Sequence, residues 1–243
     1  MNNSHQQNKE EEKLFFSNFQ SGDYDVFADS GYRRILSFFR KEITPDAGCK
    51  ILDLGCGSGA FTRYLFGLGG RVFALDISCD LMQRSGDKDR IRFSAGDIEN
   101  LPFGDNTFDV VIFSGVLHHF RALSGPAREA FRVLKKGGKC FAFDPNNKNP
   151  IMWILRNKKS PFYSSKGVTP NERLLTAGEV ESAFCSAGFS KVQAFAVSGI
   201  SYRYIHSRIA RLFLPLYNFI DYIFSKTSFA YRHGSFLLTF TQK

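Results

Sequence analysis

The stretch ILDLGCGSG at residues 51–59 decides the fold of this chain. A short apolar strand runs into a turn with glycines at alternate positions, and a helical pattern follows. Glycine adopts positive φ and lets the backbone approach a ligand closely, so such a turn can bind a small molecule. Ala60 stands where a nicotinamide dinucleotide fingerprint, G-x-G-x-x-G, would have its third glycine. Asp53 would repel a pyrophosphate and attract the ammonium of an amino-acid group.

Strand-like and helix-like segments alternate along the chain around this turn. The expected strands are residues 50–54, 71–76, 91–94, 107–113, 139–144, 192–197 and 235–241, and the expected helices between them are 58–66, 78–85, 125–134 and 176–187. Short apolar strands separated by helices are typical of a parallel sheet with helices on both faces. The sequence therefore predicts a doubly wound α/β fold. Residues 1–12 are expected to be a disordered tail and 14–43 to be helical.

Carboxylates follow the second and third expected strands. Asp76 ends the second strand, 21 residues after Gly55, where doubly wound folds place a carboxylate that accepts hydrogen bonds from ribose hydroxyls. Asp97 and Ile98 follow the third strand, and such a pair can hold an adenine amino group beside an apolar wall. The order of sites is thus ammonium, ribose and adenine, without a phosphate site.

In combination, these motifs resemble the class I S-adenosylmethionine-dependent methyltransferases, in the type 11 methyltransferase-domain group. The blocks that carry the resemblance are DLGCGSG at 53–59, ALDIS at 74–78, AGDIENLPF at 95–103, FDVVIFSGVLHHF at 108–120 and REAFRVLKKGGKCFAFDPN at 128–146. They cover about residues 47–146, roughly two-fifths of the chain. The resemblance implies a Rossmann-like, seven-stranded, mostly parallel sheet in the order 3-2-1-4-5-7-6, with 235–241 as the antiparallel strand. It implies one methyltransferase domain at 47–243, preceded by a tail and helical lid at 1–46.

The resemblance implies S-adenosylmethionine as the cofactor and assigns its contacts. The glycine turn is expected to hold the methionine end, Asp76 the ribose, and Asp97 with Ile98 the adenine. Ser114 is expected on the methionine side, and Tyr24 over the cofactor. The full set of expected cofactor residues is Tyr24, Asp53, Gly55, Cys56, Gly57, Gly59, Asp76, Ile77, Leu81, Asp97, Ile98 and Ser114.

The chemistry of methyl transfer limits what else the site needs. Transfer from a sulfonium displaces a neutral leaving group, so we expect no metal and no covalent intermediate, only alignment and desolvation. A base is needed only where the acceptor must lose a proton. His118 and His119 follow the fourth strand, where the acceptor meets the methyl group in this family, and His119 is the first candidate for a base. Asp144 ends the fifth strand and either orients an acceptor hydroxyl or amine, or caps the turn.

The basic residues of the chain are unevenly distributed. Residues 146–243 hold 13 Lys and Arg against 4 Asp and Glu, which accounts for the whole net charge of +9. Within this part, apolar residues recur at helical spacing behind Arg203, Arg208 and Arg211. The members of this apolar stripe are Ile205, Ile209, Leu212, Phe213, Leu216, Phe219, Ile220 and Ile223. The stripe indicates a helix packed on the core or on a second subunit, or alternatively an interfacial helix at a membrane.

Two insertions, about 146–175 and 198–234, are expected to form the acceptor side. We predict a small-molecule acceptor with an apolar or lipid-like part, methylated on oxygen, nitrogen or carbon. The enzyme would be cytoplasmic, with peripheral membrane contact through 201–224. One alternative is an RNA or protein methyltransferase that uses the basic C-terminal region, and another is a non-catalytic S-adenosylmethionine-binding scaffold. Nucleic acid is disfavoured, because neither an Asn/Asp-Pro-Pro-aromatic motif nor a Pro-Cys pair follows the fourth strand.

Cysteine spacing and hydropathy exclude other classes. The five cysteines are odd in number and form no C-x-x-C pair, which argues against a disulfide framework or a zinc site. No run of about 18 uncharged apolar residues is present, so a membrane-spanning helix is not expected. The polar, acidic start of the chain is unlike a secretory signal.

Overall fold

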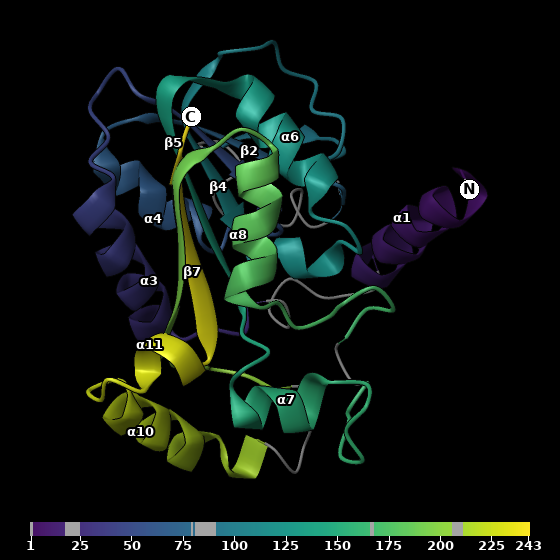
Figure 1. Ribbon diagram of the computed structural model, residues 1–243, viewed down its shortest axis with the longest axis vertical. Helices are drawn as coiled ribbons and strands as arrows, with labels where there is room; N and C mark the ends of the chain where they lie inside the picture. Colours follow the sequence, from purple (N-terminus) through teal and green to yellow (C-terminus); the bar gives the residue numbers. More distant parts are fainter. Residues whose placement is uncertain (1, 18–24, 79, 81–90, 166–167, 206–210) are drawn as a thin grey trace.

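A computed structural model describes residues 2–17, 25–78, 80, 91–165, 168–205 and 211–243 (Figure 1). Its centre is a seven-stranded sheet in the order β3-β2-β1-β4-β5-β7-β6, which confirms the predicted fold. The strands are β1 (Lys50–Leu54), β2 (Arg71–Asp76), β3 (Arg92–Ala95), β4 (Phe108–Ser114), β5 (Leu134–Pro145), β6 (Ser190–Val197) and β7 (Phe236–Gln242). β7 pairs antiparallel with both β5 and β6, whereas the pairs from β3 to β5 are parallel.

The helices cover both faces of this sheet. They are α1 (Asn2–Ser17), α3 (Asp29–Glu42), α4 (Thr62–Leu65), α6 (Ser124–Val133), α7 (Pro150–Arg156), α8 (Ala177–Ser186), α10 (Leu214–Phe224) and α11 (Ala230–His233), with 3-10 turns η1 (Phe66–Leu68) and η2 (Leu117–His119). Figure 1 shows α3 and α4 on one face and α6 and α8 on the other.

Alternation along the strands accounts for the two hydrophobic layers. Successive side chains of a strand point to opposite faces, so β1 sends Leu52 into the layer shared with α6 and α8 and Ile51 into the layer shared with α3. Ile35 and Phe39 of α3 are fully buried in that second layer. The sheet is therefore apolar on both faces, as the continuous apolar strands predict.

The N-terminal segment corrects the sequence-based expectation. The first twelve residues were expected to be a disordered tail, yet α1 runs from Asn2 to Ser17. The expected long helix at 14–43 is interrupted at the described residues 25–28, and α3 begins only at Asp29. α1 is held by polar contacts of Lys9 and Glu12 with distant residues, which a local pattern does not reveal.

The apolar stripe of the C-terminal insertion is not part of the core. Leu216 and Phe219 of α10 are 56% and 63% exposed, whereas Asp221 on the same helix is 5% exposed. Oδ2 of Asp221 accepts the backbone N–H groups of Gly199 and Ile200 at 2.6 and 3.2 Å. The side-chain amide of Asn218 makes hydrogen bonds in both directions with the backbone of Tyr202. Core packing of the stripe is thus wrong for its members between Leu212 and Ile223, which are exposed, whereas Ile205 is half-buried and Ile209 lies outside the described residues.

None of the helices within the described ranges is long and apolar enough to cross a membrane. Cys49, Cys56, Cys140 and Cys185 are free thiols, as expected of a chain without a disulfide framework, and Cys79 is outside the described residues.

Because the polar side of α10 faces inward, we expect a polar residue of this helix to contribute more to stability than an apolar residue on its outer side. Asp221→Ala should lower the free energy of unfolding by about 2 kcal/mol, because it leaves buried backbone N–H groups without an acceptor. Phe219→Ala on the outer side should change it by less than about 0.5 kcal/mol. Urea unfolding of both variants measures the two values. A larger loss for Phe219→Ala than for Asp221→Ala would contradict this orientation of the helix.

Candidate functional site

The glycine turn after β1 requires glycine for two reasons. Gly55, Gly57 and Gly59 have φ values of 70°, 52° and 82°, a region that side chains disfavour. A Cβ on Gly55 would also lie 2.4 Å from Cβ of Val116, which follows β4. The backbone of the turn, which carries no side chain at Gly55, therefore lies close to the end of β4.

Asp76 fixes this turn to the end of β2. Its Oδ2 accepts the backbone N–H of Gly57 at 2.8 Å, and its Oδ1 accepts that of Ser78 at 2.8 Å. Burial raises the pKa of the Asp76 carboxyl. The backbone N–H of Ile77 also contributes to holding this carboxylate, which offers about four lone-pair positions, so a position remains for a ligand hydroxyl.

A cavity lies at the carboxyl ends of β2 and β3. Asp76, Ile77, Asp97 and Ile98 line it together with Gly55, which unites the expected ribose and adenine residues. Oδ2 of Asp97 lies 2.6 Å from Nζ of Lys9, on α1, which also lies 2.9 Å from Glu99. The N-terminal helix therefore covers the end of the cavity at which Asp97 lies.

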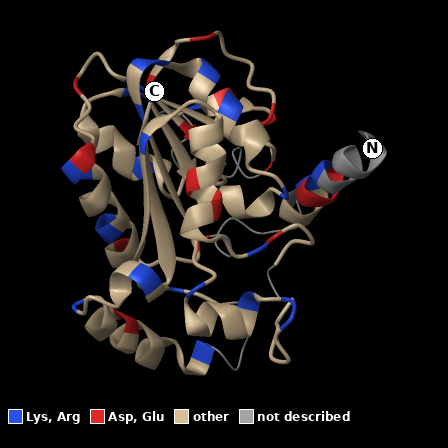
Figure 2. Ribbon diagram, in the orientation of Figure 1, with Lys and Arg blue, Asp and Glu red and all other residues tan. Residues whose placement is uncertain are grey.

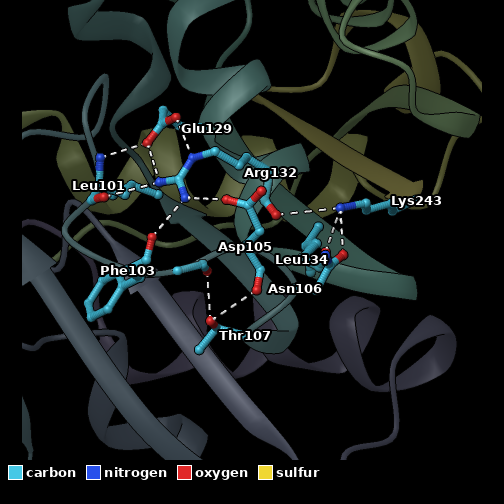
Figure 3. A network of polar contacts seen from close by, with 10 residues as sticks. Leu101, Phe103, Asp105, Asn106, Thr107, Glu129, Arg132, Leu134 and Lys243 are labelled. Atoms are coloured by element: carbon cyan, nitrogen blue, oxygen red, sulfur yellow. Dashed lines mark hydrogen bonds and ion pairs between the residues drawn. The ribbon is translucent and has the colours of Figure 1, made fainter.

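The loop that carries Asp97 and Ile98 is held by α6 (Figure 3). Arg132 donates to the carbonyl oxygens of Leu101 and Phe103 at 3.1 and 2.8 Å. Glu129 accepts the Leu101 N–H at 2.7 Å and pairs with Arg132. Arg132 also pairs with the side chain of Asp105 at 2.8 Å, so α6 holds the loop through both backbone and side-chain groups.

Asp53 lies beneath the cleft rather than in it. The carboxylate is fully buried and accepts the hydroxyls of Thr62, at 2.6 Å, and of Ser114. Burial raises its pKa to about 7. Ser114 lines the larger cavity but Asp53 lines neither, so Asp53 can reach a ligand only through Ser114.

A second, larger cavity of about 180 Å³ adjoins the first. Gly55, Phe16, Gly115 and His119 line both cavities, so the two are continuous. Its wall is aromatic, and the rings are Phe15, Phe16, Phe27, Tyr32, Phe61, Phe143, Tyr202 and Phe236. Its polar residues are Ser58, Ser114, His118, His119, Arg156, Thr169 and Glu172. The cavity thus combines an apolar body with one polar group of side chains.

His119 is held by groups from two other segments. Its Nδ1 lies 3.2 Å from Oε2 of Glu12, on α1, and 3.1 Å from Oγ1 of Thr169. Glu12 is itself 7% exposed and accepts from Asn171 at 3.1 Å. Burial alone would lower the pKa of His119, but the hydrogen bond and charge of Glu12 raise it overall.

His118 is engaged on the opposite side by Asp144. Its ring Nδ1 and its backbone N lie 2.9 and 3.0 Å from Oδ1 of Asp144. Burial lowers the pKa of His118 to about 3 and raises that of Asp144 to about 8. His118 is therefore neutral near pH 7 and lines the cavity, whereas Asp144 lines neither cavity and anchors η2.

One group of side chains has the composition of a metal site. Among the residues that the structure describes, His118, His119 and Glu172 place one ligand atom each within 4.8 Å of one another. Each already has a protein partner, which for Glu172 is Arg156 at 3.6 Å. Hydrogen bonding and ion pairing account for the cluster, and the expectation of no metal stays a prediction.

The remaining expected residues differ in their placement. Cys56 lines the larger cavity, while Gly57 and Gly59 shape the turn without lining either cavity. Tyr24 and Leu81 lie outside the described residues. Of the two insertions, the first contributes Met152, Arg156, Thr169 and Glu172 to the larger cavity, and the second contributes Tyr202.

Several functional candidates were missed from the sequence. Lys9, Glu12 and Phe16 belong to a segment that carries no motif, and Thr169 and Glu172 lie in an irregular loop. The contacts of Lys9, Glu12 and Thr169 span 50 to 159 residues, beyond the range of local patterns.

Comparison with known proteins identifies the family. The model of the methyltransferase domain matches residues 52–142. The ubiquinone/menaquinone biosynthesis C-methyltransferase UbiE of Desulfotalea psychrophila is 30% identical over 180 residues, which cover 68% of this chain and 70% of that protein. The chain belongs to the class I S-adenosylmethionine-dependent methyltransferases of the type 11 group.

Two further comparisons show how much of this chain is similar to other proteins. The demethylmenaquinone methyltransferase of Corynebacterium kroppenstedtii is 38% identical over 100 residues, 41% of this chain and 43% of that protein, so the match spans less than half of that relative. Phosphoethanolamine N-methyltransferase 2 of Haemonchus contortus, solved with S-adenosylmethionine, has a TM-score of 0.64 at 16% identity, over 87% of this chain and 52% of that one. At this identity the likeness shows the fold.

The residues of the smaller cavity fit S-adenosylmethionine, the cofactor of the family. Asp76, Asp97 and Ile98, the residues expected to hold the ribose and the adenine, line this one cavity. Ser114, which the sequence places on the methionine side, is held by Asp53 and lines the adjoining larger cavity. A Cβ on Gly96 would lie 2.8 Å from Leu75, so the backbone there is kept bare.

The assignment of Asp76 makes a prediction for cofactor affinity. Asp76→Asn should raise the calorimetric Kd for S-adenosylmethionine roughly 10- to 100-fold, because hydrogen bonds to a charged group are worth about 1.5–3 kcal/mol. The matched control is Asp80→Asn, an exposed carboxylate four residues on, which should leave the Kd unchanged. Equal affinities in the wild type and both variants would remove Asp76 from the ribose site.

Proposed function

We propose that the chain transfers a methyl group from S-adenosylmethionine to a small molecule with an apolar or lipid-like part. The observation that carries this proposal is the aromatic cavity that adjoins the cofactor cavity through Gly55, Gly115 and His119. Apolar rings favour an apolar acceptor, and the polar residues that line the cavity would orient its reacting atom. Two relatives named for menaquinone methylation support the same class of acceptor.

In the proposed mechanism, the cofactor and the chain have different roles. The cofactor supplies a methyl group on a sulfonium, whose departure leaves a neutral sulfide. The chain aligns the acceptor and excludes water, through the aromatic wall and through Phe16 of α1, which lines both cavities. Ser114 and the glycine turn keep the methionine side in place.

We infer that His119 is the base where the acceptor must lose a proton. It lines both cavities, and its neutral form can accept a proton. His118 is the weaker candidate, because burial lowers its pKa to about 3. Glu12 would hold the His119 ring in position and stabilise its protonated form, as a carboxylate does behind a catalytic histidine.

We further propose that the enzyme works in the cytoplasm and contacts a membrane peripherally through the 201–224 region. An acceptor with a lipid-like part partitions into membranes, so the enzyme must meet it there. The exposed apolar side of α10 supports this proposal.

Methyl-labelled S-adenosylmethionine tests the acceptor class. The purified chain and a cell extract are incubated, and the products are separated into organic, aqueous and acid-insoluble fractions. We expect the label in the organic phase. Nuclease- or protease-sensitive label in the insoluble fraction would contradict the proposal and favour an RNA or protein acceptor. Tight cofactor binding with no labelled product would indicate a non-catalytic scaffold.

The pairing of Glu12 with His119 makes a pH prediction. Because Glu12 raises the pKa of His119, the acidic limb of kcat/KM should lie above the ordinary value near 6.5. Glu12→Gln should move that limb to lower pH and lower the plateau rate, since the base is weaker. Glu172, Asp144, Asp76 and His118 also face His119 and are unchanged by this substitution.

The control for this experiment is Glu11→Gln, an exposed neighbour on the same helix, which should keep the wild-type profile. A Glu12→Gln profile that coincides with the wild type would show that Glu12 does not act through His119.

A further inference from the structure

The α10 helix is amphipathic with its polar side turned inward. Asp221 and Asn218 face the protein and bind backbone groups of residues 199–202. Large apolar side chains of the same helix face outward instead. A helix of a water-exposed protein normally buries its apolar side, so this arrangement indicates that an apolar medium covers α10.

The exposed apolar residues extend beyond α10 to two neighbouring helices. Figure 1 shows α7, α10 and α11 at one end of the molecule, near the end of β5. We call this the apolar end surface, and its exposed members are Ile151, Trp153, Ile154, Phe162, Leu212, Phe213, Leu216, Phe219, Ile220, Tyr222, Ile223, Phe229 and Tyr231. Phe162, Leu212, Phe229 and Tyr231 are 66–80% exposed.

The exposed charged residues on the segments that form this surface have one sign. In the described parts of 145–165 and 198–234, the exposed charged residues are all basic, namely Lys148, Lys158, Lys159, Arg203, Arg211, Lys226 and Arg232. The acidic residue within these parts is Asp221, which is buried. Figure 2 shows Lys and Arg around α7, α10 and α11. The Lys226 ammonium lies 4.6 Å from the ring centre of Tyr222, so cationic and aromatic groups meet at the rim.

Apolar residues with a purely basic rim suit an anionic lipid surface better than the other candidates. In a symmetric dimer, both copies would bring the same basic groups to one interface, and like charges repel. At an anionic bilayer the basic groups meet phosphates, while the apolar side chains enter the boundary of the acyl chains.

We propose that the apolar end surface docks the enzyme on an anionic membrane and that α7 links this surface to the acceptor cavity. Met152 and Arg156 of α7 line the cavity, while Ile151 and Ile154 of the same helix are 39% and 40% exposed. One helix therefore contributes residues both to the docking surface and to the wall of the acceptor cavity. The proposal rests on the proposed function for its purpose, but docking itself is measurable without acceptor or cofactor.

Sedimentation with vesicles tests the docking. The full chain is mixed with sucrose-loaded vesicles of phosphatidylcholine, or of phosphatidylcholine with one-third phosphatidylglycerol. We expect binding to the anionic vesicles, at least tenfold weaker binding to the neutral ones, and a loss of binding as salt is raised. Equal binding to both compositions without salt dependence, or binding to neither, would overturn the proposal.

Two pairs of variants locate the docking surface. Leu216→Ser with Phe219→Ser should lower vesicle partitioning at least tenfold, since each buried apolar side chain is worth about a factor of ten. The matched control is Leu14→Ser, which changes a 64% exposed leucine of α1 and should bind as the wild type does. Lys226→Glu with Arg232→Glu should also lower partitioning roughly tenfold or more, whereas Lys136→Glu, at the far end of the sheet, should not.

Circular dichroism and calorimetry with S-adenosylmethionine show that the variants fold, and light scattering gives their mass. A wild-type dimer that becomes a monomer in Leu216→Ser with Phe219→Ser, without vesicle binding, would make the surface a self-interface and overturn the proposal. Vesicle docking with no labelled product leaves docking intact and contradicts only the proposed function. Labelled product without docking contradicts only the docking.

Discussion

The carboxylate of Asp76 accepts two backbone N–H groups, from Gly57 and Ser78, and much of the site depends on this contact. It holds the glycine turn after β1 against the end of β2. Backbone atoms of this turn, rather than side chains, therefore form the floor of the cleft. The cost is a buried carboxylate, whose pKa burial raises. Asp53, on the neighbouring strand β1, is a buried carboxylate as well. It accepts two side-chain hydroxyls, and this contact orients Ser114. The buried carboxylates of Asp76 and Asp53 thus position the groups that line the cleft.

The N-terminal helix α1 covers the two cavities at the edge of the sheet. Lys9 meets Asp97 at the adenine end, and Glu12 meets His119 where the two cavities join. One short helix therefore contacts both the cofactor side and the acceptor side. A ligand bound in either cavity would therefore contact the same helix and stabilise it.

The sequence predicted the parts of this protein that depend on local pattern. Asp76 and Asp97 were found because the ends of parallel strands meet at one edge, so a residue type at a strand end has a known place. Glu12 was missed because its contacts with Thr169, Asn171 and His119 join distant segments. The apolar stripe of α10 was recognised from its periodicity, but periodicity does not tell which side of a helix faces the protein. Asp221 and Asn218 decide that, through hydrogen bonds to a strand end that only the folded chain brings near.

Hydrogen–deuterium exchange with and without S-adenosylhomocysteine tests the central claim most directly, because it reports on the cleft and on α1 in one experiment. We expect slower exchange in peptides covering residues 53–59 and 95–101 and in α1 around residues 9–16, with no change in α10. Protection of the glycine turn without α1 would contradict the placement of this helix against both cavities. No protection at 53–59 under saturating ligand would contradict the cofactor site itself.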